Sequence, residues 1–268
     1  MKKIISRLWL VVVLLFMYSP ILILSVYSFT KSTMIGKIRG FSFHNYVTLF
    51  TTDELRSMIF GTVALALAVS ILSVVLGTCG ALGVYYGSKK QKTVLEFFNR
   101  IPVVNADVVT GFSVCILLIV FLRISKDTFL PLLIGQCVLC TPFVYLSIKP
   151  RLYAMDPHLY EAALDLGCTP WMALRKVVLK ELVPGIVSGF LTSVTLSVDD
   201  YFITTYTKPA AFDTISTYVV NATKGSQTEI KTALWALSTL IFLLVVCVVL
   251  FGYLRSMKNV KETEANEK

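Results

Sequence analysis

The sequence predicts an all-α integral membrane protein with six transmembrane helices. Three observations support this fold class: the composition, the long apolar stretches and the distribution of charge. Hydrophobic residues make up 56% of the 268 residues and charged residues only 15%, whereas a soluble domain has about 45–50% and about 25%. The mean hydropathy is +0.75. So much apolar surface requires lipid as its solvent, which excludes a cytosolic enzyme and a secreted disulfide scaffold.

Each transmembrane helix is predicted from an apolar stretch long enough to cross a bilayer, which takes about 20 residues. Barrel strands would instead alternate over about ten residues. The first stretch is too long for a signal peptide, and no small-x-small cleavage site follows it, so we expect an uncleaved span. Residues 1–268 then form a single transmembrane domain. The six spans are 8–29, 58–86, 99–122, 129–148, 184–206 and 232–254.

The basic residues predict the orientation of these spans. Sixteen of the 25 Lys and Arg residues fall on one side, in the N-terminus, segments 87–100 and 149–183, and the C-terminal tail. Because cytoplasmic loops carry the excess of Lys and Arg, both termini and the loop 149–183 are predicted to be cytoplasmic. The same rule explains the net charge of +9, so no nucleic-acid partner is expected.

The six cysteines predict neither a metal site nor a redox site. Cys137 and Cys140 have a CxxC spacing, but no second pair exists, and the two histidines, His44 and His158, are far away in the sequence. We therefore expect the cysteines to act as small packing residues.

Two glycine series predict close helix packing, because small residues let helix backbones approach each other. They are Gly77, Gly80, Gly83 and Gly87 in the second span, and Gly185 and Gly189 at the start of the fifth.

The loop 149–183 predicts two short helices separated by a sharp turn. Asp156 followed by Pro157 is a typical helix start, Gly167 is a typical stop, and Thr169 followed by Pro170 repeats the start signal. A helix displayed in this way is suited to docking into a groove on another protein.

Small side chains at Ala162, Ala163 and Gly167 would let a partner's backbone come close. The alternative is a loop that lies on the lipid headgroups, held there by basic side chains. These are Arg175, Lys176 and Lys180.

The loop resembles the "EAA" motif of binding-protein-dependent ABC importer permeases. The matching positions are Glu161, Ala162, Ala163, Gly167 and Leu179; Val177 stands where the family has Ile, and Lys180 stands where it has Pro. The resemblance covers nearly the whole chain. It implies the type I ABC importer permease (MetI-like) fold, with a cytoplasmic coupling helix in this loop.

The same resemblance implies a set of partners in the cell membrane. They are a homologous second permease subunit, a cytoplasmic ATPase dimer that binds ATP and magnesium, and an extracytoplasmic substrate-binding protein. The chain itself lacks a Gly-x-x-x-x-Gly-Lys-Ser/Thr phosphate loop. We therefore expect a non-catalytic subunit that binds no cofactor.

A narrower resemblance concerns the substrate. Residues 196–200, Leu-Ser-Val-Asp-Asp, look like the Ser-x-Asp-Asp segment of the second permease subunit of spermidine/putrescine importers. The segment around Asp107 is also similar, although Ala106 stands where Pro is commoner. The resemblance implies a polyamine substrate. Related permeases for iron, sulfate, thiosulfate or phosphonates share the scaffold and remain alternatives.

Asp199 and Asp200 lie among apolar residues in the fifth predicted span. An acid at the centre of a membrane helix costs about 2.5–3.5 kcal/mol, so we expect both to face water or protein. They could attract a cationic substrate with the help of the aromatic ring of Tyr201. Alternatively, Ser, Thr or Lys208 satisfies a buried pair. Asp107 either lines the pathway or complements a helix dipole.

Two further functions remain as alternatives. One is an ion-driven secondary transporter. The other is a membrane aspartyl hydrolase that pairs Asp107 with Asp199 or Asp200, which requires two carboxylates that share a proton. The linear order of the spans places Asp107 near the inner face and Asp199 toward the outer face, which argues against the hydrolase.

Overall fold

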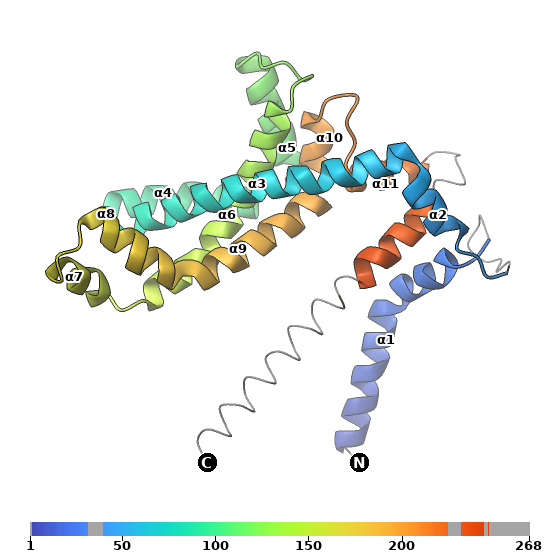
Figure 1. The fold of residues 1–268 in the computed structure, drawn as a ribbon, viewed down its shortest axis with the longest axis horizontal. Coiled ribbons are helices and arrows are strands. Elements are labelled where there is room, and N and C mark those ends of the chain that lie inside the picture. The colour runs from blue at the N-terminus through green and yellow to red at the C-terminus, as the bar shows by residue number, and fades with distance from the viewer. Residues whose placement is uncertain (1, 32–39, 225–231, 244–245, 247–268) are drawn as a thin grey trace. The chain divides into compact units, whose positions relative to one another are not determined.

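The computed structural model describes residues 2–31, 40–224, 232–243 and 246. Within these ranges the regular structure is helical apart from one isolated bridge between Thr30 and Phe41, which confirms the all-α prediction (Figure 1). The chain divides into two compact units, Met1–Arg56 with Val219–Lys268, and Ser57–Tyr218. The single transmembrane domain over residues 1–268 stays a prediction.

The first unit contains α1 (Lys2–Ser28) and α2 (His44–Thr51). The amide of Asn45 in α2 joins them, because it donates hydrogen bonds to the carbonyls of Ser28 (2.9 Å) and Thr30 (3.2 Å) at the end of α1. Four aromatic rings pack around the same corner: Phe29, Phe41, Phe43 and Tyr46.

Four helices in the described ranges are long and apolar enough to cross a membrane, or five if one bent pair counts as a span. Three of them correspond to the first, second and fourth predicted spans: α1, α3 (Asp53–Tyr86) and α6 (Leu130–Ala154). The fourth runs from Pro170 to Asp199 and ends in α9 (Leu179–Asp199). Of the sixth predicted span, 232–243 is helical, and most of the remainder lies outside the described residues.

The third predicted span, 99–122, is wrong as a single helix. Its first residues end α4 (Lys89–Val104), and the chain then bends by 110° into α5 (Asp107–Cys115) and the π-helix η1 (Ile116–Phe121). Asn105 and Ala106 are extended at the break, where the Asn105 amide donates to the Thr110 hydroxyl at 3.1 Å. Valines stand on both sides of the break, at 103–104 and at 108–109, so the apolar stretch continues across it and does not register the bend.

The fifth predicted span, 184–206, is also broken. After α9 the chain is extended at Asp200, and a separate short helix, α10, covers Phe202–Thr207. The helix α11 (Ile215–Lys224) follows.

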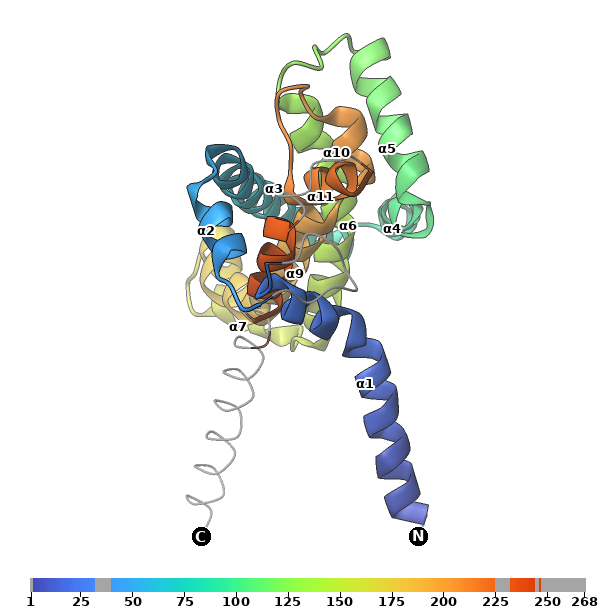
Figure 2. The same cartoon turned by 90° about the vertical axis from the view of Figure 1, so that its right-hand side faces the viewer.

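The main contact of the second unit is between α6 and α9, which lie side by side (Figures 1 and 2). A Cβ atom added at Gly185 would lie 3.1 Å from Arg151 Cγ, and one at Gly189 would lie 3.0 Å from Val144 Cγ1. The packing predicted at these two glycines is therefore confirmed.

The same face of α9 continues with small residues at four-residue steps. The Cys140 thiol donates to the Ser193 carbonyl at 3.6 Å, and the amide of Gln136 donates to the Ser197 carbonyl at 3.5 Å. Ser193 and Ser197 are buried. We call this antiparallel contact the α6–α9 seam; on α9 its members are Gly185, Gly189, Ser193 and Ser197.

The glycine series of the second span packs only in part. A Cβ atom at Gly77 would lie 2.8 Å from Val144 Cγ1, whereas one at Gly83 would meet nothing within 4 Å. The close-packing prediction therefore holds at Gly77 and is wrong at Gly83 within the described structure.

The seam predicts a sharp difference between two serines of α9. Ser193 is fully buried against α6, whereas Ser188 is exposed. We expect Ser193→Leu to destabilise the purified chain by about 1–3 kcal/mol through overpacking, and Ser188→Leu to change stability little. Thermal unfolding in detergent measures both. Equal melting temperatures for the two variants would contradict the seam.

Candidate functional site

The break in the fifth span is organised by the carboxylate of Asp200. Its oxygens accept hydrogen bonds from the backbone N–H of Ile203 (3.2 Å), the backbone N–H of Thr204 (2.8 Å) and the Thr204 hydroxyl (2.7 Å). The residue is 8% exposed. Asp200 therefore satisfies the free N–H groups at the start of α10, which explains why the chain restarts a helix here.

A buried amide extends this cap to a third helix. Gln136 in α6 is fully buried and donates to the Thr204 hydroxyl at 2.8 Å, while the Ser197 hydroxyl donates to its side-chain oxygen. These four side chains, Asp200, Thr204, Gln136 and Ser197, form what we call the polar cluster. It joins α6, α9 and α10.

Sequence reasoning missed Gln136. The available signal was a lone amide within the apolar stretch 129–148, because an amide buried in a membrane helix requires hydrogen-bond partners.

The short helices α5 and α10 pack together (Figures 1 and 2). A Cβ atom at Gly111 in α5 would lie 3.0 Å from the Cα of Ile203. Further along, the rings of Phe112 and Tyr206 have centroids 5.8 Å apart, and the Cys115 thiol donates to the Tyr206 carbonyl at 3.4 Å. Residues later in α5 contact residues later in α10. The two helices therefore run parallel, with their N-termini at the same end.

The predicted pathway residues lie at or beside helix ends. Asp107 is the first residue of α5 and is exposed; Asp199 is the last residue of α9 and is also exposed. Tyr201 is half-buried, and the centroid of its ring lies 5.2 Å from that of Phe202. The expectation that Asp107 and Asp199 lie at different depths assumed two unbroken helices, whereas both spans are broken; it stays a prediction.

Lys208 does not neutralise this site. Its ammonium group pairs with Asp213 at 2.9 Å and donates to the carbonyl of Phe212 at 2.6 Å. Hydrogen bonds from α10 satisfy Asp200, and the Asp199 carboxylate lies at the surface.

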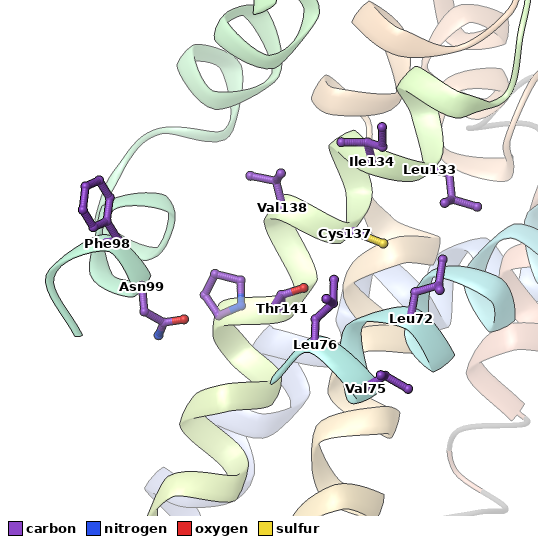
Figure 3. Close-up of a pocket in the computed structure, with 11 residues that line it drawn as sticks. Leu72, Val75, Leu76, Phe98, Asn99, Leu133, Ile134, Cys137, Val138 and Thr141 are labelled. Atoms are coloured by element: carbon purple, nitrogen blue, oxygen red, sulfur yellow. The ribbon is translucent and has the colours of Figure 1, made fainter. Parts of the chain in front are cut away.

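A groove of about 540 Å³ lies between α3, α4 and α6 (Figure 3). Its wall is almost entirely apolar, and the lining includes Leu76, Phe98 and Val138, with the Asn99 amide at one edge. The lining contains no charged side chain and none of the predicted pathway residues. Such a wall suits an apolar occupant rather than a cation. Throughout the described residues, no group of three or more His, Cys, Asp or Glu could hold a metal ion.

The loop between α6 and α9 forms the predicted helix, turn and helix. The Asp156 carboxylate accepts from the N–H of His158 (2.9 Å) at the start of α7 (His158–Asp165). Gly167 has a φ of +83°, and two backbone bonds close the turn, Gly167 N–H to Leu164 and Cys168 N–H to Ala163. Thr169 then caps α8 (Pro170–Ala173), which continues through the π-helix η2 (Leu174–Val178) into α9.

The structure exposes some of the motif residues and buries others. Glu161, Ala162 and Gly167 are exposed, and Leu179 is half-buried at the start of α9. Ala163 is only 6% exposed, so the prediction that it lies on the outer surface of the loop is wrong.

Two large apolar residues beside the glycine turn are exposed. Leu166 is 86% exposed and Trp171 is 69% exposed. Sequence reasoning missed both, because the loop holds many other large apolar residues, such as Leu152 and Val178, that the structure buries. Exposed large apolar residues are a signal for a contact with a partner.

Two neighbouring threonines test the polar cluster. We expect Thr204→Val to lower the free energy of unfolding by about 1–3 kcal/mol, because Asp200 loses a donor and Gln136 loses an acceptor. The matched control is Thr205→Val, whose hydroxyl bonds only the Tyr201 carbonyl one turn back. Thermal unfolding of both variants decides; a Thr204→Val variant as stable as the control would contradict the cluster.

Comparison with known proteins places this arrangement in a family. A family model described as "Binding-protein-dependent transport system inner membrane component" matches residues 80–257. The putrescine transport system permease protein PotI of Escherichia coli K12 is 30% identical over 243 residues, which cover 87% of this chain and 85% of that protein. The spermidine/putrescine transport system permease protein PotC of Haemophilus influenzae is 30% identical over 249 residues, covering 92% and 95%.

A solved structure supports the fold independently. A chain of a bacterial ABC transporter that imports the acidic polysaccharide alginate aligns with a TM-score of 0.67 and 20% identity, covering 95% of this chain and 98% of that one. The chain therefore belongs to the family of binding-protein-dependent transport system inner membrane components, the multi-pass permease subunits of ABC importers.

Proposed function

We propose that the chain is one of two homologous permease subunits of an ATP-driven importer of polyamines such as spermidine and putrescine. The single observation that carries the proposal is that two carboxylates are exposed beside the packed short helices, Asp107 at the start of α5 and Asp199 three residues before the start of α10. The printed names of the two 30% identical relatives support the substrate class.

The chemistry of the site suits a polycation. Each ammonium group of a polyamine is attracted by a carboxylate and by the face of an aromatic ring. Asp199 is the better candidate to contact it, because hydrogen bonds from α10 already occupy the oxygens of Asp200. Tyr201 supplies an aromatic ring two residues after Asp199, and the Phe112–Tyr206 ring pair lies further along α5 and α10. We assign Asp200 a structural role, in which its carboxylate caps α10 and so stabilises the break between α9 and α10.

In this proposal, ATP hydrolysis by a separate ATPase drives transport through a contact with α7. The cytoplasmic ATPase dimer binds ATP and magnesium and docks on the exposed loop residues Glu161, Ala162 and Gly167, with Leu166 and Trp171 as apolar anchors. Leu179 transmits the movement where the loop enters α9. Both termini are then cytoplasmic, and an extracytoplasmic binding protein delivers the substrate. The chain itself catalyses no reaction.

The loop is firmly attached to the helices that it would move. Tyr160 in α7 and Leu174 in η2 pack against the core cluster that contains Val144, Ile148 and Leu182. A displacement of α7 would therefore be transmitted to α6 and α9 together.

Reversing one exposed charge tests the docking surface. We expect Glu161→Lys to reduce substrate-stimulated ATP hydrolysis by the assembled importer about tenfold or more, because charge reversal at a protein interface places like charges together. The control is Glu181→Lys, an exposed acid in the first turn of α9, outside α7 and the glycine turn. Membrane insertion of both variants is checked by detergent extraction. Full stimulation with Glu161→Lys would exclude α7 as the docking surface.

The two adjacent aspartates give separate predictions. Asp199→Asn should raise the KM for putrescine about tenfold, equivalent to about 1.4 kcal/mol of lost attraction, with no change in stability. Asp200→Asn should lower the melting temperature, because it weakens the cap of α10. Asp127→Asn, in the exposed turn before α6, is the control for surface charge. Uptake by Asp199→Asn at the unaltered KM would remove this residue from the pathway.

A further inference from the structure

Where η2 passes into α9, one face of this continuous helix borders a shallow, open groove of about 630 Å³, and basic side chains line it. Arg175 and Lys176 come from η2, and Lys180 comes from the first turn of α9. The remaining wall is aliphatic, from Leu179 and Val183. We call it the basic groove.

The three cations of the basic groove have no acidic partner within the described part of the chain. The ion pairs found there join Arg56 to Asp53, Lys149 to Glu96, His158 to Glu161 and Lys208 to Asp213. Arg175, Lys176 and Lys180 are all exposed. Their positive charge is therefore available to an external anion.

An exposed aliphatic stripe begins inside the basic groove and follows α9 into the apolar part of the span. Val183, Val187 and Leu191 are 48%, 50% and 59% exposed. They recur at four-residue steps, so they lie on one side of the helix. The cations at one end suit an anionic group, and the aliphatic side chains along the next two turns suit an apolar chain. A partner that fits both is amphiphilic.

We infer that the basic groove binds an anionic phospholipid, with the phosphate against Arg175, Lys176 and Lys180 and an acyl chain along Val183, Val187 and Leu191. Arginine and lysine are the side chains that usually donate hydrogen bonds to phosphate groups in proteins. Basic residues at the membrane surface are also attracted electrostatically to anionic headgroups. An acidic protein surface or free phosphate would match the cations alone. The aliphatic stripe that starts between them favours lipid.

The test counts lipid directly. The full chain, purified in detergent, is mixed with phosphatidylglycerol or phosphatidylcholine, and native mass spectrometry measures how many molecules it retains. We expect selective retention of phosphatidylglycerol, and a loss of about tenfold or more in the Arg175→Gln, Lys176→Gln, Lys180→Gln variant. The charge-preserving Lys176→Arg, Lys180→Arg variant should retain the lipid, which shows that the loss does not come from misfolding.

A second triple variant is the matched control. Lys89→Gln, Lys90→Gln, Lys92→Gln removes the same charge from α4, which does not line the basic groove, and should retain phosphatidylglycerol. An equal loss in both triple variants would overturn the site in favour of diffuse attraction. Displacement by inorganic phosphate, or unchanged lipid retention with loss of a co-purifying ATPase, would overturn it in favour of a free anion or an acidic protein. Since no transport is measured, the result is independent of the polyamine proposal.

Discussion

The α6–α9 seam is the contact on which the second unit depends. Gly185 and Gly189 bring the helix backbones together near the loop, and Ser193 and Ser197 continue the contact toward the break. In lipid, helices gain little from hydrophobic association, so close van der Waals contact and interhelical hydrogen bonds must hold them. The seam therefore joins the loop, at one end of α9, to the polar cluster at the other end.

The polar cluster makes a broken helix possible inside a membrane protein. Free backbone N–H groups cannot be left in contact with lipid, and the Asp200 carboxylate satisfies those at the start of α10. Because that acid is occupied in holding the fold, Asp199 is the neighbouring acid that remains available. Discontinuous helices are a known way for transporters to bring polar groups to a binding site. Here Asp107 and Asp200 also offset the positive dipole ends that would repel a cation.

Local signals were sufficient for part of this structure. Asp156, Gly167 and Thr169 act on backbone groups within a few residues, so the sequence was enough to predict the loop's turn and helix starts. Hydropathy located the spans but could not register the breaks, because a capping side chain alters the path of the chain without altering its average polarity. Gln136 finds its partner Ser197 61 residues away, and the burial of Ala163 depends on tertiary packing. Neither contact can be read from neighbouring residues.

The central claim is that force from a separate ATPase enters at the loop and moves α6 and α9 as a pair. Uptake of labelled putrescine into vesicles that contain this chain with its second permease subunit, its binding protein and the ATPase tests it most directly. We expect uptake only when the ATPase and ATP are both present. Uptake driven by an ion gradient after the ATPase has been left out would contradict it.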